Sequence, residues 1–321
     1  MTLAFVFPGQ GSQFVGMGKS LAEAYPTAKA VFEEVDDALG QDLSALIWDG
    51  DAEALTLTEN AQPALFATSM AAVRALATEG VSVSQAAFVA GHSLGEYSAL
   101  AAAGMISVAD GARLLRIRGT AMQSAVPVGQ GAMAAVLGMD FDSVDEVARS
   151  AAQGQVCAAA NDNDPSQVVV SGHRAAVERA ADIAKDRGAK RVVMLPVSAP
   201  FHCELMEPAA HTMAEALSQV QHNPLQIPLI ANVEARPVSD PATICSLLVD
   251  QVTGNVRWRE SVEYMIQHGV SELWELGAGK ALCGMGRRID RSLTTRAIGT
   301  PEDVRAAAAS LMEARAAEAV S

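Results

Sequence analysis

The chain has 321 residues, of which 50% are hydrophobic, and its formal net charge is −14. This acidic balance argues against general binding to nucleic acid or to an anionic membrane surface. The length and the apolar fraction allow one large domain or two smaller ones with a sizeable core.

The cysteines and the first residues indicate the compartment. Cys157, Cys203, Cys245 and Cys283 form no Cys-x-x-Cys pair and no Cys/His cluster with zinc spacing, which favours free thiols in a reducing cytoplasm. Residues 1–8 are apolar but lack a basic start and a cleavage site, so they predict a strand and not a signal peptide. No apolar run reaches the roughly 18 residues that a transmembrane helix needs. We therefore expect a cytoplasmic protein without a membrane partner.

Apolar strands and helical patterns alternate in the first part of the chain. Residues 3–7 predict a buried strand, which Pro8-Gly9 ends before the polar loop at residues 10–13. A second strand is expected at residues 86–90. The expected helices of this part are residues 20–25, 27–39, 59–79, 97–103 and 110–124.

Residues 126–196 change this rhythm and predict a small inserted subdomain. The turn-rich run at residues 161–165 is expected to separate its two middle strands. The expected elements in order are strand 133–137, helix 142–152, strands 155–160 and 167–171, helix 174–187 and strand 191–195. A β-α-β-β-α-β order is typical of the ferredoxin-like fold.

Strands and helices alternate again after the insert. Pro208 should separate the first turn of the helix expected at residues 203–220. The other expected elements are strands 229–231, 273–276 and 296–298, and helices 241–252, 261–267, 282–289 and 302–318. Such alternation predicts a parallel or mixed sheet with helices on both faces. We expect residues 1–125 and 197–321 to form this large domain.

A strand-to-helix turn with the pattern Gly-x-Ser-x-Gly lies at residues 89–96. This context is typical of a nucleophile elbow, which raises a serine hydroxyl above the end of a sheet. Gly91 and Gly95 would lie too close to the strand and the helix to carry side chains. The unpaired N–H groups at the helix start favour an oxyanion there. Ser93 is therefore the candidate nucleophile, and the backbone N–H of Leu94 is a candidate oxyanion donor.

A serine nucleophile needs a base, and the chain has six histidines. His92 adjoins Ser93, but adjacent side chains project in different directions, so His92 is poorly placed to accept the proton. His202 lies in a Pro-containing loop at a helix start, and the order serine first, histidine later is that of α/β-hydrolases. This order predicts an α/β-hydrolase-like large domain. No acid between the two stands out, so a Ser-His dyad is at least as well supported as a triad.

Several short motifs, taken in order, carry a family resemblance over essentially the whole chain. They are residues 5–13 (Phe-Val-Phe-Pro-Gly-Gln-Gly-Ser-Gln), residues 91–97 (Gly-His-Ser-Leu-Gly-Glu-Tyr), Arg118-Gly119, residues 200–202 (Pro-Phe-His), Gln251 and residues 256–258 (Val-Arg-Trp). With them the chain resembles the malonyl-CoA:acyl-carrier-protein transacylases of fatty-acid synthesis. The acyltransferase domains of polyketide synthases share the pattern, so the pathway stays open.

The resemblance implies a role for each matching residue. Ser93 would be acylated, and His202 would take its proton and later serve the incoming thiol. The backbone N–H groups of Gln10 and Leu94 would form the oxyanion hole. Arg118 would bind the free carboxylate of the malonyl group, which suits the planar fork of a guanidinium.

Two further positions concern the orientation of the base and the choice of substrate. Gln251 is expected among the substrate-binding residues, and one of its oxygens would orient His202 in place of an acid. Asp250 is the rival for this orienting role. Leu94 and Phe201 resemble the malonyl-selecting members. Phe201 departs from many stand-alone bacterial members, which carry a small residue there, and so blurs the line to polyketide-type domains.

The resemblance also implies the substrates and the partner. Malonyl-CoA would donate the malonyl group, the phosphopantetheine thiol of acyl carrier protein would receive it, and no cofactor or metal would be bound permanently. An acidic carrier would need a local basic patch on this acidic protein. Candidates for that patch are Lys190, Arg191, Lys280, Arg287 and Arg288.

Two other classes of function remain. A serine hydrolase acting on an ester or thioester would share Ser93 and His202 but would have no use for Arg118. A scaffold without catalysis would need none of the three.

Overall fold

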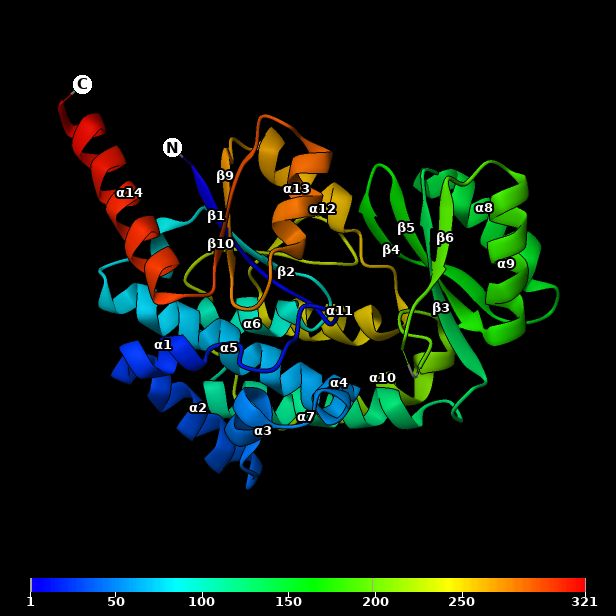
Figure 1. Cartoon of the computed structure of the whole chain (residues 1–321), viewed down its shortest axis with the longest axis horizontal. Helices are drawn as coiled ribbons and strands as arrows, with labels where there is room; N and C mark the ends of the chain where they lie inside the picture. The colour runs from blue at the N-terminus through cyan, green and yellow to red at the C-terminus, as the bar shows by residue number, and fades with distance from the viewer. Residues whose placement is uncertain (1, 198, 321) are drawn as a thin grey trace.

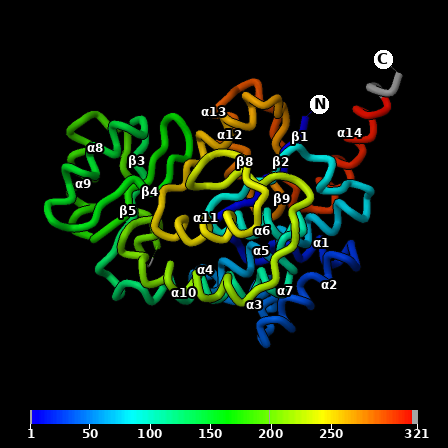
Figure 2. Tube along the Cα trace, turned by 180° about the vertical axis from the view of Figure 1, so that it is seen from behind, coloured from blue at the N-terminus to red at the C-terminus, as the bar shows by residue number. Residues whose placement is uncertain are grey.

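Two sheets organise the computed structural model, which describes residues 2–197 and 199–320 (Figure 1). The larger sheet has six strands in the order β10-β9-β1-β2-β7-β8, and the smaller has four in the order β4-β5-β3-β6. Met1, Ser198 and Ser321 belong to the expected large domain and lie outside the described residues. Both chain ends lie at the side of the large sheet that faces away from the small one (Figures 1 and 2).

The larger sheet is parallel except at one edge, as the alternation of strands and helices predicts. Its strands are β1 (Leu3–Phe7), β2 (Phe88–Gly91), β7 (Leu229–Ile230), β8 (Pro237–Val238), β9 (Glu272–Leu276) and β10 (Thr294–Ile298). Only β8, paired with β7, runs antiparallel. The carboxyl ends of the parallel strands therefore meet at one edge, where α/β proteins place their ligands.

Strand β1 shows why helices must cover both faces. All five of its residues are buried, and successive side chains of a strand point to opposite faces. Leu3, Phe5 and Phe7 join the apolar core on one face, and Ala4 and Val6 join a second core on the other. A strand without a polar face is stable only between two layers of helices.

The helices form these two layers. On the first face lie α5 and α6, with α1, α2, α3, α7 and α10 further out, and on the second face lie α12 and α13 (Figure 1). The helices outside residues 126–196 are α1 (Lys19–Ala24), α2 (Pro26–Leu39), α3 (Leu43–Asp49), α4 (Ala52–Thr56), α5 (Thr58–Thr78), α6 (Gly95–Ala102), α7 (Val108–Ser124), α10 (Glu207–Ser218), α11 (Pro241–Thr253), α12 (Trp258–Gln267), α13 (Ala281–Ile289) and α14 (Pro301–Val320).

The smaller sheet is antiparallel and has a core of its own. Its elements are β3 (Gly131–Leu137), α8 (Phe141–Ala152), β4 (Cys157–Asp164), β5 (Gln167–His173), α9 (Arg174–Asp186) and β6 (Arg191–Met194). Helices α8 and α9 cover one face and enclose a Val- and Ala-rich cluster. Their order confirms the predicted ferredoxin-like fold.

The expected turn at residues 161–165 is wrong, because β4 continues to Asp164. Residues 161–164 pair with β5 through two irregular steps. Asn161 also bridges to Val256, and the N–H of Asp162 donates to the carbonyl oxygen of Val256 at 2.9 Å. The segment just before α12 (Trp258–Gln267) thus supplies a pairing partner that lies about 95 positions further along the chain, which local turn propensity does not reveal.

Short elements are the other differences from expectation. The sequence pattern missed α3, α4 and β8, as well as the 3₁₀ turn Val83–Gln85. The separate turn before Pro208 is confirmed as a 3₁₀ turn, Glu204–Met206. Within the described residues, no helix combines the length and the apolarity that a membrane crossing requires, and all four cysteines are free.

Buried acids of β4 join the small sheet to the large domain. Asp162, whose side chain is 1% exposed, pairs with Arg259 of α12 at 2.8 Å. Asp164 is fully buried and pairs with Arg288 of α13, also at 2.8 Å. Burial raises the pKa of Asp162, and the Arg259 guanidinium opposes this shift.

We expect Arg259→Ala to lower the free energy of unfolding by about 3 kcal/mol, because it leaves the buried Asp162 carboxylate without its cation. Arg149→Ala, which breaks a pair with Asp145 in which Arg149 is 79% exposed, should cost less than about 1 kcal/mol. Urea unfolding of both variants measures the difference. Equal losses would contradict a role for burial at this junction.

Candidate active site

The turn at Ser93 is a nucleophile elbow with no spare room. Ser93 has a φ of 53°, in the left-handed region that side chains rarely adopt. A Cβ atom on Gly91 would lie 1.9 Å from the backbone of Gly95, and one on Gly95 would lie 2.2 Å from the carbonyl oxygen of Phe7. The two glycines are therefore required because strand β2, helix α6 and the end of β1 meet here.

Asn232, two residues after the end of β7, holds both sides of this turn. Its Oδ1 accepts the backbone N–H of Ser93 at 2.8 Å, and its Nδ2 donates to the carbonyl oxygen of Gly91 at 2.6 Å. Sequence reasoning missed this residue. Its place at the carboxyl end of a parallel strand is the signal that could have found it.

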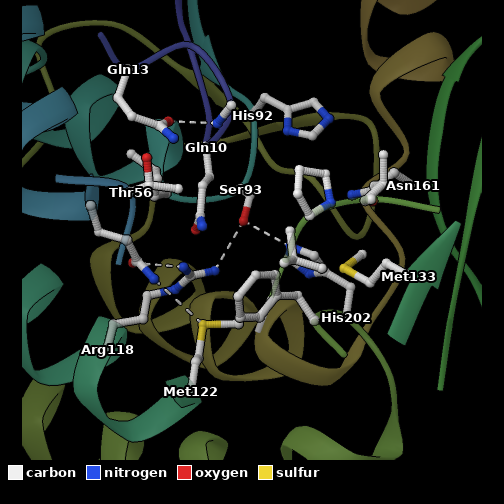
Figure 3. A pocket seen from close by; sticks show the side chains of 17 residues that line it. Gln10, Gln13, Thr56, His92, Ser93, Arg118, Met122, Met133, Asn161 and His202 are labelled. Carbon is white, nitrogen blue, oxygen red and sulfur yellow. Dashed lines mark hydrogen bonds between the residues drawn. The ribbon is translucent and has the colours of Figure 1, made fainter. Parts of the chain in front are cut away.

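The serine hydroxyl lies against the imidazole expected to act on it (Figure 3). Ser93 Oγ is 2.7 Å from His202 Nε2, and His202 Nδ1 is 2.8 Å from the backbone carbonyl oxygen of Gln251. A carbonyl oxygen only accepts, so Nδ1 carries the proton and Nε2 is free to accept one from Ser93. Asp250 is exposed, and no contact joins it to His202 among the described residues.

The same burial that holds His202 in place keeps it neutral. Its side chain is 4% exposed, and burial, followed by the nearby charge of Arg118, lowers its pKa to about 3. The Gln251 carbonyl opposes this shift. At neutral pH the imidazole therefore carries an open acceptor nitrogen, the state that a general base needs.

Arg118, on α7, is a buried cation next to the serine. It is 1% exposed, and its Nη2 donates to Ser93 Oγ at 3.1 Å and to Gln251 Oε1 at 2.8 Å. Its Nη1 donates to Gln62 Oε1 at 2.8 Å, and its guanidinium carbon lies 5.8 Å from the ring centre of Tyr97. No carboxylate forms an ion pair with it among the described residues. A guanidinium held by neutral amides keeps its charge available for an anionic ligand.

Two residues that line the cavity at Ser93, from different segments, have an unpaired backbone N–H group among the described residues. Within the described residues, the N–H of Leu94, at the start of α6, and the N–H of Gln10, after β1, have no hydrogen-bond partner. The N–H of Ser93 is taken by Asn232. The side chain of Gln10 accepts a hydrogen bond from Thr58 Oγ1 at 2.9 Å, which holds the loop in place. This pair of donors can stabilise an oxyanion.

A cavity of about 250 Å³ opens over these groups. Its polar part contains Gln10, Ser93, Arg118 and His202, and Phe201, 8% exposed, contributes to the apolar part. The other lining residues are Gly11, Gln13, Thr56, Gln62, His92, Leu94, Met122, Met133, Asn161, Leu195, Pro196 and Val197. Met133 and Asn161 of the small sheet thus line the cavity together with Gln10 and Ser93, which follow strands of the large sheet (Figure 3).

The remaining histidine near the serine has another partner. His92 Nε2 lies 2.8 Å from Asn163 Oδ1 of β4, and burial lowers the pKa of His92. It contacts the small sheet and not the hydroxyl. Among the described residues, no three His, Cys, Asp or Glu side chains are placed to hold a metal ion.

Comparisons with known proteins agree on one family. Residues 4–272 match the family model of the acyl transferase domain. The malonyl CoA-acyl carrier protein transacylase of Bacillus subtilis is 46% identical over 312 residues, which cover 97% of this chain and 98% of that relative. The chain belongs to the family of malonyl CoA-acyl carrier protein transacylases.

Solved structures of this family have the same fold. An acyl-carrier-protein-S-malonyltransferase from Bartonella henselae is 55% identical and superposes with a TM-score of 0.94, covering 96% of this chain and 98% of that one. A malonyl-transacylase in complex with a type II PKS acyl-carrier protein is 42% identical, with a TM-score of 0.92 and coverage of 95% and 98%. These matches confirm the predicted α/β fold and the family resemblance.

We expect the His202 imidazole to stay neutral from pH 8 down to about pH 4.5. The unfolded chain takes up this proton near pH 6.5, whereas the folded chain does so only near 3. His202 therefore lowers the free energy of unfolding as the pH falls through this window. Histidine-labelled NMR, with the resonance assigned by loss in His202→Gln, measures the titration, and a midpoint between pH 6 and 7 would contradict it.

Proposed function

We propose that this enzyme transfers the malonyl group from malonyl-CoA to the phosphopantetheine thiol of acyl carrier protein through a malonyl ester on Ser93. The observation that carries the proposal is the buried Arg118 guanidinium, 3.1 Å from Ser93 Oγ. A hydrolase of neutral esters has no use for a desolvated cation at its nucleophile. One methylene group separates the two carbonyl carbons of malonate, so a carboxylate bound to Arg118 brings the thioester carbonyl to the serine.

In the first half-reaction, Ser93 Oγ attacks the thioester carbonyl and its proton passes to His202 Nε2. The N–H groups of Gln10 and Leu94 stabilise the oxyanion, and removal of one such donor typically costs about 100- to 1,000-fold in rate. The C–S bond then breaks, and His202 returns the proton to the leaving CoA thiolate. Malonyl-serine remains in the site.

In the second half-reaction, the carrier thiol gives its proton to His202 Nε2 and its sulfur attacks the ester carbonyl. The C–O bond to Ser93 breaks, and the proton returns to the serine oxygen. This is a ping-pong mechanism that needs no resident cofactor or metal. The carbonyl of Gln251 keeps the imidazole tautomer correct in both halves.

The apolar part of the cavity supports transfer over hydrolysis. Phe201, Met122 and Met133 lie beside the nucleophile and limit the room for water. We place Phe201 and Leu94 among the residues that select malonyl over bulkier groups. A polyketide carrier is a second candidate partner, because the similar malonyl-transacylase was solved with a type II PKS acyl-carrier protein.

We also propose that residues 126–196 form a separate subdomain, since their sheet has its own core. We propose a cytoplasmic location as well, which the free cysteines support.

The basic docking patch for the carrier stays a prediction. Lys190, Arg191, Lys280 and Arg287 are exposed and form no ion pair among the described residues, whereas Arg288, although exposed, is paired with Asp164. The first four are therefore the better candidates.

We expect Arg118→Ala to reduce kcat/KM for malonyl transfer roughly 100-fold while it retains or raises acetyl transfer, because only malonyl has a carboxylate to lose. Parallel assays with malonyl-CoA and acetyl-CoA measure both rates. Arg113→Ala, five positions earlier on α7 with a side chain that is 53% exposed, is the matched control and should behave like the unaltered enzyme. An unchanged preference for malonyl in Arg118→Ala would rule out the carboxylate role.

We expect the unaltered enzyme to gain one malonyl group on incubation with malonyl-CoA, and Ser93→Ala to gain none, because the ester oxygen is missing. Intact-mass measurement detects the adduct, which carrier protein should then discharge. An adduct in Ser93→Ala would exclude Ser93 as the nucleophile. Steady release of free malonate without carrier protein would favour a thioesterase instead.

A further inference from the structure

We propose that Glu96 is a positioning residue that fixes the side-chain amide of Gln251 and, through it, Arg118. This inference rests on the proposed function. Glu96 lies in the first turn of α6, three residues after the nucleophile, and is 1% exposed. Its Oε2 accepts a hydrogen bond from Gln251 Nε2 at 2.6 Å.

Gln251 is the residue at which three parts of the site meet. Its backbone carbonyl oxygen accepts from His202 Nδ1, and its Oε1 accepts from Arg118 Nη2. Its Nε2 donates to the backbone carbonyl oxygen of Ser93 at 3.0 Å as well as to Glu96. The nucleophile, the base and the cation are thus all joined to one fully buried residue.

The direction of the Gln251 amide decides whether this junction works. An amide has one face that accepts and one that donates, and Arg118 offers only donors. If the amide turned over, its NH₂ group would face the guanidinium. Two buried N–H donors, one from Gln251 and one from Arg118, would then meet without an acceptor between them. Three acceptors on the other side oppose this: the Glu96 carboxyl group at 2.6 Å, the Ser93 carbonyl oxygen at 3.0 Å and Asn232 Oδ1 at 3.5 Å. Of the two side chains among them, Glu96 makes the short contact, whereas Asn232 also holds the turn at Ser93, so Glu96 is the one to substitute.

The arrangement also keeps the acid away from the cation. The amide of Gln251 lies between Glu96 and Arg118, and the carboxyl group and the guanidinium form no ion pair among the described residues. A direct pair would neutralise Arg118 and compete with the malonyl carboxylate. Burial raises the pKa of Glu96 to about 8, and the hydrogen bond from Gln251 and the charge of Arg118 oppose this shift.

Two variants separate the contact from the ionisable group. Glu96→Gln keeps the length and an acceptor oxygen but cannot ionise, whereas Glu96→Asp keeps a carboxyl group in the first turn of α6 but is one methylene too short to reach Gln251 Nε2. Ser98→Ala is the matched control, since Ser98 lies on the same helix, is equally buried and has no partner for its hydroxyl among the described residues.

The experiment measures kcat and KM for transfer from malonyl-CoA and from acetyl-CoA to carrier protein, normalised to the fraction that forms a serine adduct. We expect Glu96→Asp to lower kcat/KM for malonyl roughly tenfold to 100-fold and to lower the malonyl-to-acetyl ratio, as loss of an orienting partner does. Glu96→Gln and Ser98→Ala should stay within about threefold of the unaltered enzyme in both measures.

A merely structural role would reduce the active fraction and leave the malonyl-to-acetyl ratio unchanged, which would overturn the proposal. So would a Glu96→Gln variant that loses the ratio while Glu96→Asp retains it, because the charge would then be what matters. If Glu96→Asp does not fold, Glu96→Ala, which removes the acceptor altogether, takes its place with the same expected loss of the malonyl-to-acetyl ratio, and an unchanged ratio in Glu96→Ala would overturn the proposal. Failure of the unaltered enzyme to transfer malonyl would refute the proposed function itself, whereas normal transfer by all variants refutes only the role of Glu96.

Discussion

The close approach of strand β2 to helix α6 is the constraint on which the rest of the site depends. With no room for a Cβ at Gly91 or Gly95, the chain turns so sharply that Ser93 takes a left-handed φ. That conformation sets the hydroxyl against His202 Nε2, and the N–H of Leu94 next to it has no partner among the described residues. Asn232 then binds both sides of the turn, so the strained conformation is held by hydrogen bonds from a neighbouring strand.

Burial of charge is the second determinant, and it acts on two groups at once. The apolar surroundings that desolvate Arg118 also lower the pKa of His202 to about 3, and the charge of Arg118 adds to that shift. Neutral amides of Gln62 and Gln251 hold the guanidinium without cancelling it. The same buried environment thus places a neutral base and a cation without a carboxylate partner in contact with one serine hydroxyl. Such a site suits an acyl group that carries a carboxylate.

Most elements of the fold could be predicted because the spacing of apolar residues that marks a strand or a helix lies within the element itself. The alternation of apolar strands with helices indicated the mixed sheet, and the β-α-β-β-α-β order indicated the ferredoxin-like insert. The failures have a common physical cause. Strand β4 continues through turn-rich residues up to Asp164 because Val256, far along the chain, pairs with it, and the two-residue strand β8 exists only through its pairing with β7. Neither partner is visible in a local window.

The sequence by itself determined the elbow, since glycine, serine and glycine in a strand-to-helix context permit few other conformations. Its motifs also indicated Ser93, His202 and Arg118 as residues of one site. Only the tertiary structure decided how these groups meet. Helices α7 and α11 pack against the elbow. Because of this packing, Arg118 is buried against Ser93, and the backbone carbonyl of Gln251, not Asp250, faces the imidazole. Contacts between residues 25 to 158 positions apart are set by packing, and no short motif encodes them.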